Sequence, residues 1–201
     1  MKLAIIKYNA GNIRSVSFAL ERLGIAFDIT DDHETIAKAD RVIFPGVGEA
    51  RNTMAYLKEK KLDAVIRDLR QPVLGICLGM QLLCKHSEEY DTPCLGVFDQ
   101  TVQQFIPKGS MKVPHMGWNA LRIKDGWLDP SLDGAYVYFV HSYYIPVNEY
   151  TSAETDYIVP FSAAMQKDNF YAVQFHPEKS AEAGVTVLKS FMQASTLLER
   201  K

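Results

Sequence analysis

The amino-acid sequence predicts an α/β protein with an open, mostly parallel central sheet, flanking helices and additional mixed or antiparallel strands. In the first half of the chain, short apolar runs alternate with segments whose apolar residues recur at helical spacing. Such alternation is typical of parallel strands joined by helices that cover both faces of a sheet. The second half contains many short extended runs and ends in one helical segment, which predicts the additional strands.

In the first half, each apolar run is followed by a helical pattern. Asn12 can cap the first helix, and Gly24 ends it, because glycine readily adopts the left-handed conformation that closes helices. The strands are expected at residues 3–6, 25–29, 41–44 and 73–76. The helices are expected from residue 13 to Gly24, over 32–39, over 49–69 with a break near Lys60, and along an amphipathic stretch at 80–85.

The second half is predicted to be mostly extended. Asp168-Asn169 is a turn signal between two strand-like runs, which predicts a hairpin. The strands are expected at residues 101–106, 120–123, 135–145, 151–154, 162–166 and 170–175, and a final helix over 181–198. Because no linker or repeat divides the chain, we expect residues 1–201 to form a single domain.

Composition excludes several classes of function. The formal net charge is -2 and no basic run is present, so we expect neither a nucleic acid nor a membrane as partner. The apolar run at the N-terminus is too short for a signal peptide. An odd set of three cysteines, Cys77, Cys84 and Cys94, argues for a reducing compartment, and hence for the cytoplasm. Without a close cluster of metal-ligating side chains, we expect no metal and no cofactor.

The stretch Gly75-Ile76-Cys77-Leu78-Gly79 is a nucleophile elbow with sulfur in place of a hydroxyl. A sharp turn from strand to helix would force Cys77 into a strained backbone conformation, and the flanking glycines would leave room for it. The sulfur would then lie above the end of the sheet, where the start of a helix favours a thiolate. The alternative is a buried structural cysteine whose glycines serve packing alone.

A thiol nucleophile needs a base and a group that orients the base. In an extended segment, His176 and Glu178 would point to the same side, and Pro177 favours that geometry for His176. The three side chains would then form a Cys77–His176–Glu178 triad. The alternative for His176 and Glu178 is an ordinary His-Pro turn with a solvated carboxylate.

Acyl transfer through a thiol also needs donors for an oxyanion. The amide of Leu78 directly follows the nucleophile, and the segment Gly46-Val47-Gly48 can supply a second amide because glycines permit close backbone approach. The alternative for this segment is a plain turn after a strand.

At these residues the chain resembles the class I glutamine amidotransferases, a family with a flavodoxin-like sheet. Within that family it is similar to the glutaminase subunits of imidazole glycerol phosphate synthase. The elbow and His176-Pro177-Glu178 carry the family resemblance, and 113–119 with 139–144 carry the finer one. The resemblance implies that Cys77 attacks the amide of glutamine, that His176 moves the proton, and that the thioester is hydrolysed. It also implies that the amides of Val47 and Leu78 hold the oxyanion. The contacts to glutamine that it implies come from Gly46, Gly48, Gln81, His141, Ser142 and Tyr143.

The resemblance further implies a partner, a cyclase subunit with a (β/α)8 barrel. This subunit would form a heterodimer with the chain, receive its ammonia and release imidazole glycerol phosphate and an aminoimidazole carboxamide ribonucleotide in histidine biosynthesis. An exposed tryptophan is a common interface anchor, so we expect Met116 and Trp118 to contact the partner, with Asn12 and Lys179 as polar contacts. A departure from the pattern occurs in the loop around Asn9, where relatives often carry glycine.

Three rival functions share parts of this pattern. An amidotransferase subunit that serves another acceptor would keep the triad but lack the Trp118 segment and the run His141-Ser142-Tyr143. A cysteine peptidase or γ-glutamyl hydrolase would act without a partner. A binding protein that has lost catalysis would usually lack one residue of the triad, and this chain has all three.

Overall fold

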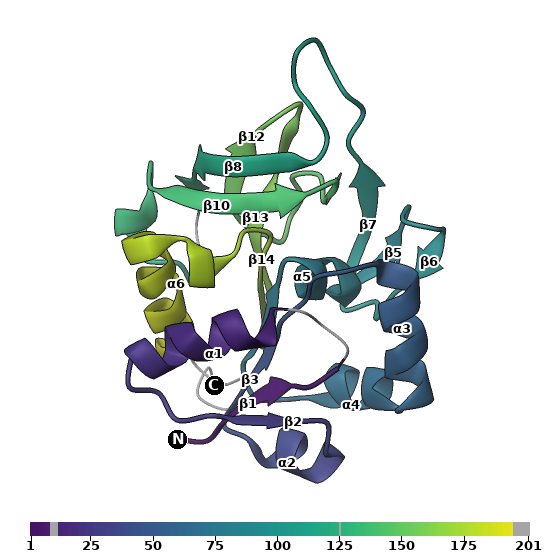
Figure 1. Ribbon diagram of the computed structural model, residues 1–201, viewed down its shortest axis with the longest axis vertical. Coiled ribbons are helices and arrows are strands. Elements are labelled where there is room, and N and C mark those ends of the chain that lie inside the picture. Colours follow the sequence, from purple (N-terminus) through teal and green to yellow (C-terminus); the bar gives the residue numbers. More distant parts are fainter. Residues whose placement is uncertain (9–11, 125, 195–201) are drawn as a thin grey trace.

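The computed structural model describes residues 1–8, 12–124 and 126–194, and these residues form a three-layer α/β structure (Figure 1). The main sheet has eight strands, of which the first five in spatial order run parallel and the others antiparallel. In that order they are β2 (Asp28–Thr30), β1 (Leu3–Ile6), β3 (Arg41–Phe44), β4 (Val73–Ile76), β14 (Phe170–Val173), β13 (Pro160–Lys167), β12 (Thr151–Asp156) and β9 (Arg122–Ile123).

Helices cover both faces of the parallel part (Figure 1). Alternate strand residues enter two separate cores: Leu3 and Ile5 pack with the first and last helices of the described residues, whereas Ala4 and Ile6 pack with the helices between those two. The pattern confirms the predicted doubly wound sheet. The helices are α1 (Ile13–Arg22), α2 (His33–Lys38), α3 (Ala50–Glu59), α4 (Leu62–Asp68), α5 (Leu78–Leu83) and α6 (Ala181–Gln193), with 3-10 turns η1 (Pro130–Leu132) and η2 (Pro177–Lys179).

Two smaller sheets flank the main one. An antiparallel ribbon crosses above β12 to β14, and a second small sheet lies beside α5 (Figure 1). The ribbon consists of β8 (His115–Ala120) and β10 (Tyr136–His141), and the other sheet of β11 (Tyr143–Tyr144), β7 (Phe98–Gln104), β5 (Cys84–Ser87) and β6 (Thr92–Pro93).

Most predicted elements are present, with displaced ends. The break near Lys60 is real, since Lys61 adopts φ 55 between α3 and α4, and Asp168 turns the predicted hairpin with φ 52. Gly24 ends the first helix with φ 67. The second strand begins at Asp28 rather than at residue 25, because the amide of Ile25 is still bonded to the carbonyl of Leu20 at 3.0 Å.

Other expectations were wrong. The stretch 80–85 is not an amphipathic helix, because α5 is buried on every side and ends at Leu83, directly before β5 begins at Cys84. Strands β5, β6 and β8 were not predicted; Pro114 and Gly117 interrupt the apolar pattern around β8. The side chain of Asn12 makes no capping hydrogen bond to α1. Residues 195–198 of the expected last helix, and Asn9 in the first loop, lie outside the described residues.

The carboxyl ends of three adjacent parallel strands bring the candidate site together. Residues 46–48 follow β3, Cys77 follows β4, and His176 lies shortly after β14. Ligands of open α/β sheets bind at this edge. Among the described residues, no helix is long and apolar enough to span a bilayer.

The packing of α6 against η2 yields a stability prediction. A Cβ on Gly184 would lie 1.9 Å from the carbonyl oxygen of Pro177, in the turn that carries Glu178. We expect Gly184→Ala to lower the free energy of unfolding by about 2 kcal/mol in urea denaturation. Glycine-to-alanine changes inside helices usually stabilise a protein by about 1 kcal/mol. A loss of stability in Gly184→Ala would therefore point to the close contact with Pro177.

Lys189→Ala on the exposed face of the same helix is the control, with an expected change below about 0.5 kcal/mol. A gain of stability in Gly184→Ala would contradict the close approach of α6 and η2.

Candidate active site

The turn at Cys77 has the strained geometry of a nucleophile elbow. Cys77 adopts φ 53 and ψ −107 between β4 and α5, and its amide donates to the carbonyl of Val173 in β14 at 2.8 Å. Gly79 is sterically required, because a Cβ on it would lie 2.0 Å from the carbonyl oxygen of Phe44. A Cβ on Gly75 would lie 2.8 Å from Cδ1 of Leu83 and 3.0 Å from the backbone of Gly79, so this position is also tightly packed. The turn therefore excludes a side chain at Gly79 and disfavours one at Gly75.

His176 and Glu178 form a buried pair close to this turn. His176 Nδ1 lies 2.8 Å from Glu178 Oε1, and both side chains are almost fully inaccessible to solvent. The expected extended geometry is wrong for Glu178, because Pro177–Lys179 form the 3-10 turn η2, which carries the carboxylate back to the imidazole. The side-chain amide of Asn12 donates to the same Glu178 oxygen at 2.9 Å.

The sulfur and the imidazole are near one another but not hydrogen-bonded. The Cys77 thiol donates to the carbonyl of Val140 at 3.9 Å, and His176 Nε2 has no hydrogen-bond partner among the described residues. Burial lowers the pKa of His176, but the Cys77 sulfur and the Glu178 carboxylate outweigh burial and raise this pKa to about 10. The imidazole is therefore ready to hold a proton in the neutral range.

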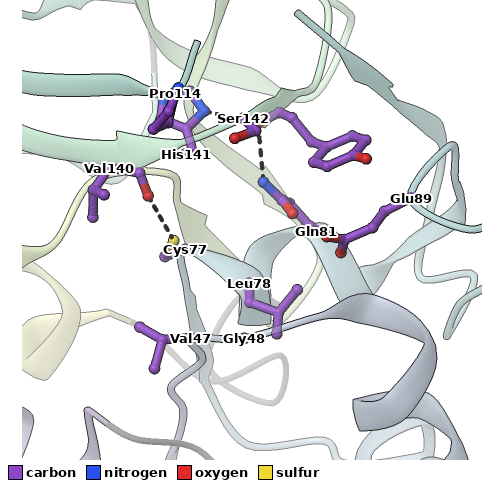
Figure 2. A pocket seen from close by; sticks show the side chains of 11 residues that line it. Val47, Gly48, Cys77, Leu78, Gln81, Glu89, Pro114, Val140, His141 and Ser142 are labelled. Atoms are coloured by element: carbon purple, nitrogen blue, oxygen red, sulfur yellow. Dashed lines mark hydrogen bonds between the residues drawn. The ribbon is translucent and has the colours of Figure 1, made fainter.

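A cavity of about 340 Å³ opens in front of Cys77 (Figure 2). It brings together most of the residues that the sequence analysis singled out for glutamine and oxyanion contacts. These are Val47, Gly48, Leu78, Gln81, His141, Ser142 and Tyr143. Gly46 does not line the cavity, and a Cβ on it would lie 2.6 Å from the hydroxyl of Tyr8.

The expected oxyanion donors are not both free in this structure. The amide of Leu78 donates to the carbonyl of Gly46 at 3.3 Å, so this N–H does not point into the cavity. Gly48 has φ 124, a conformation that favours glycine. The hydroxyl of Tyr8 donates to the carbonyl of Pro45, which anchors the start of the same segment.

His141 has no ring nitrogen left for a ligand. Its Nδ1 bonds to the carbonyl of Tyr143 at 2.7 Å and its Nε2 pairs with His115 Nδ1 at 3.0 Å. Burial lowers the pKa of His141 to about 3 and that of His115 to about 4, so both rings are neutral. Each neutral ring has one N–H donor. The N–H of His141 donates to the carbonyl of Tyr143, and the N–H of His115 donates to Nε2 of His141.

Two residues of the site were missed by the sequence analysis. Glu89 lines the cavity, accepts from the amide of Ala50 at 2.7 Å, and has its pKa raised by burial. Nothing in its polar local sequence marks it. Gln174 is fully buried, and its side-chain Nε2 donates to Cys77 Sγ at 3.7 Å. Its position two residues before His176 in an extended run was a usable signal.

The four expected interface residues divide into two groups. Met116 and Trp118 alternate along β8 and are 63% and 51% exposed, and the ring of Trp118 meets Tyr138 edge-on. Lys179 is also exposed, with its Nζ 5.8 Å from the centre of the Tyr138 ring. Asn12 is different, because it is only 6% exposed and its side-chain amide is bonded to Glu178.

Comparison with known proteins shows which family the chain is similar to. The family model for glutamine amidotransferase class-I matches residues 5–194. The HisH subunit of imidazole glycerol phosphate synthase from Bacteroides fragilis (strain YCH46) is 60% identical over 96% of this chain and 100% of its own. The corresponding subunit of Bacteroides thetaiotaomicron is 58% identical over 96% and 99%.

A solved crystal structure of a glutamine amidotransferase shares this fold with a TM-score of 0.73 at 19% identity, covering 94% of this chain and 97% of that one. The family model spans most of the sequence, and the HisH relatives align over nearly their whole length. The chain therefore belongs to the class I glutamine amidotransferases and, within them, to the HisH subunits of imidazole glycerol phosphate synthase.

Proposed function

We propose that the chain hydrolyses glutamine to glutamate and ammonia through a thioester on Cys77. The observation that carries the proposal is the strained elbow, which presents Cys77 to one cavity beside the buried His176–Glu178 pair. As a HisH subunit, the chain serves imidazole glycerol phosphate synthase in histidine biosynthesis. A binding protein without catalysis would not need the buried His176–Glu178 pair, and a hydrolase that acts alone would not belong to the HisH subunits.

In the proposed mechanism, the Cys77 thiolate attacks the side-chain carbonyl carbon of glutamine. His176 holds the thiol proton and passes it to the departing ammonia, while Glu178 keeps the imidazole oriented through Nδ1. His176 then takes a proton from water, which attacks the thioester and releases glutamate. The raised pKa of His176 suits a proton carrier that remains charged until the leaving group takes the proton.

The oxyanion would bind the amides of Leu78 and Val47. For this the carbonyl of Gly46 must leave the Leu78 amide, to which it is bonded at 3.3 Å. Val47 and Gly48 also line a second cavity, of about 220 Å³, so the segment is not packed closely along its whole length. Because the Leu78 amide is already hydrogen-bonded in the chain alone, glutaminase activity would stay low until a partner acts on this segment.

Glutamine would be held between Cys77 and the far wall of the cavity. In Figure 2 the side chains of Gln81 and Glu89 lie on that far wall. A carboxylate at this position suits the α-ammonium group of an amino acid. The proposed contacts are Gly48, Gln81, Glu89, Ser142 and Tyr143, which line the cavity, whereas Gly46 does not.

We further propose a heterodimer with a cyclase subunit that has a (β/α)8 barrel and receives the ammonia in the cytoplasm. The exposed Met116 and Trp118 on β8, with Lys179, would form part of this contact. Asn12 would act through Glu178 rather than by direct contact. Residues 1–201 are proposed to act as one domain, since the main sheet draws strands from both halves of the chain.

Cys77→Ala in the assembled synthase is expected to lower glutamine-dependent product formation at least about a thousandfold, because the nucleophile is lost. Ammonia-dependent formation by the partner should continue, as measured by product absorbance with ammonium salt. Cys94→Ala, outside the cavity, is the control and should retain both activities. Loss of both in Cys77→Ala would mean that Cys77 supports the fold or the interface instead.

Addition of the cyclase subunit and its ribonucleotide ligand is expected to raise glutaminase activity at least about tenfold, because the Leu78 amide is occupied in the chain alone. Glutamate release measured in a coupled assay tests this. Equal turnover with and without the partner would contradict the proposed control of the oxyanion site.

The charge on His176 can be followed by ¹⁵N NMR. Its raised pKa means that the imidazolium persists above the ordinary value of 6.5 and is lost only as the pH rises through about 10. Cys77→Ser should lower this pKa, since it removes the sulfur that helps to raise it. Cys94→Ser should not change it, and an unchanged His176 titration in Cys77→Ser would refute the coupling.

A further inference from the structure

The sulfur of Cys77 receives a hydrogen bond that the triad does not include. The donor is the side-chain Nε2 of Gln174, 3.7 Å from Sγ, in a side chain with no exposed surface. Among the hydrogen bonds of the described residues, it is the one that donates to this sulfur. A thiolate needs such a donor, since burial away from water destabilises its charge.

The orientation of the Gln174 amide is determined by its neighbour. Gln81 Nε2 donates one hydrogen to the carbonyl of Tyr143 and the other to Gln174 Oε1, each at 3.0 Å. Because the Gln174 carbonyl faces Gln81, its amino group must face Cys77. The reverse orientation would set two amino groups against one another and direct an oxygen at the sulfur.

The need for this donor increases when the thiol loses its proton. In the thiol form Cys77 donates to the carbonyl of Val140, as the dashed line in Figure 2 shows. After transfer of the proton to His176, the Val140 oxygen faces a charged sulfur with no hydrogen between them. The N–H of Gln174 requires no such change, because it donates to either form.

We propose that Gln174 is a further catalytic residue that stabilises the thiolate of Cys77, and that Gln81 and the Tyr143 carbonyl orient its amide from the wall of the cavity. This inference rests on the proposed glutaminase function. It gives Gln81 a second role, since both hydrogens of its amide nitrogen are engaged and only its oxygen remains for glutamine. The nucleophile is thereby linked to the substrate cavity through two side chains.

Alkylation by iodoacetamide, a neutral reagent, tests the donor in the full chain without glutamine. Burial raises the pKa of Cys94 to about 12 and that of Cys84 well above its ordinary value, so labelling near neutral pH reports on Cys77. Gln174→Leu is expected to slow Cys77 labelling at pH 7 about tenfold, measured by peptide mass spectrometry. The pH profile of labelling should move to higher pH, a change that loss of packing alone would not produce.

Gln174→Glu keeps the shape but directs a carboxylate at the sulfur, and should slow labelling at least as much. Asn169→Leu is the matched control: its buried amide also makes two hydrogen bonds, to the carbonyls of Leu69 and Gln71, at a distance from the cavity. It should lose stability without changing the labelling profile. Wild-type labelling in Gln174→Leu would overturn the proposal.

Gln81→Glu tests the orienting role. A carboxylate accepts where the amide donated, so Gln174 would turn its amino group away from Cys77, and labelling should slow. Combining Gln81→Glu with Gln174→Leu should add little further loss. Fully additive losses of labelling rate in the double variant would refute the link between Gln81 and Gln174. The glutaminase function is tested separately: it would be refuted if Cys77→Ala retained glutamine-dependent synthesis.

Discussion

The left-handed backbone of Cys77 is the constraint on which the rest of the site depends. A non-glycine residue at φ 53 and ψ −107 costs on the order of 1–3 kcal/mol. The surroundings hold the turn in this conformation: Gly79 packs directly against the carbonyl of Phe44, and α5 is buried on all sides. Relaxing the turn would displace a helix that has no solvent-exposed face. The strain therefore persists, and it delivers the sulfur to the cavity.

The groups that act on this sulfur come from the neighbouring strand β14. Val173 is paired with Ile76 in parallel register, so the residues that follow each strand meet at the same edge. Gln174 and His176 leave β14 there, and the amide of His176 is bonded to the carbonyl of Tyr138 in β10 at 2.9 Å. The ribbon thus positions the base, and its outer side carries the exposed Met116 and Trp118. One element thereby connects the proposed partner surface with the catalytic imidazole.

In the proposed mechanism, the chain alone has some parts of the site in place and others not. The nucleophile, its amide donor and the His176–Glu178 pair are assembled, but the Leu78 amide is occupied by Gly46. The segment from Pro45 to Gly48 is held at its start by the Tyr8 hydroxyl, and Val47 and Gly48 also line a second cavity. Such an arrangement allows a small backbone change, rather than movement of the triad, to control turnover.

Local sequence patterns alone predicted the elbow, the base with its orienting carboxylate, and the doubly wound sheet. The spacing of glycines around Cys77 can serve few purposes besides a tight turn, and the pair His176 and Glu178 stands beside a proline that limits its geometry. The alternation of apolar runs and helical patterns likewise predicts the doubly wound sheet, because period and handedness are properties of the local chain. Gly24 and the Asp168 turn depend on one or two residues and were located correctly.

Long-range contacts settled the remainder. The burial of α5, the pairing of His141 with His115 and the occupied Leu78 amide depend on segments far apart in the sequence. Glu89 has no local signal because its role follows from the cavity that it faces. The residues specify which groups are available and how the chain turns near them. Which of those groups are free, bonded or charged depends on neighbours that folding alone brings within hydrogen-bond distance.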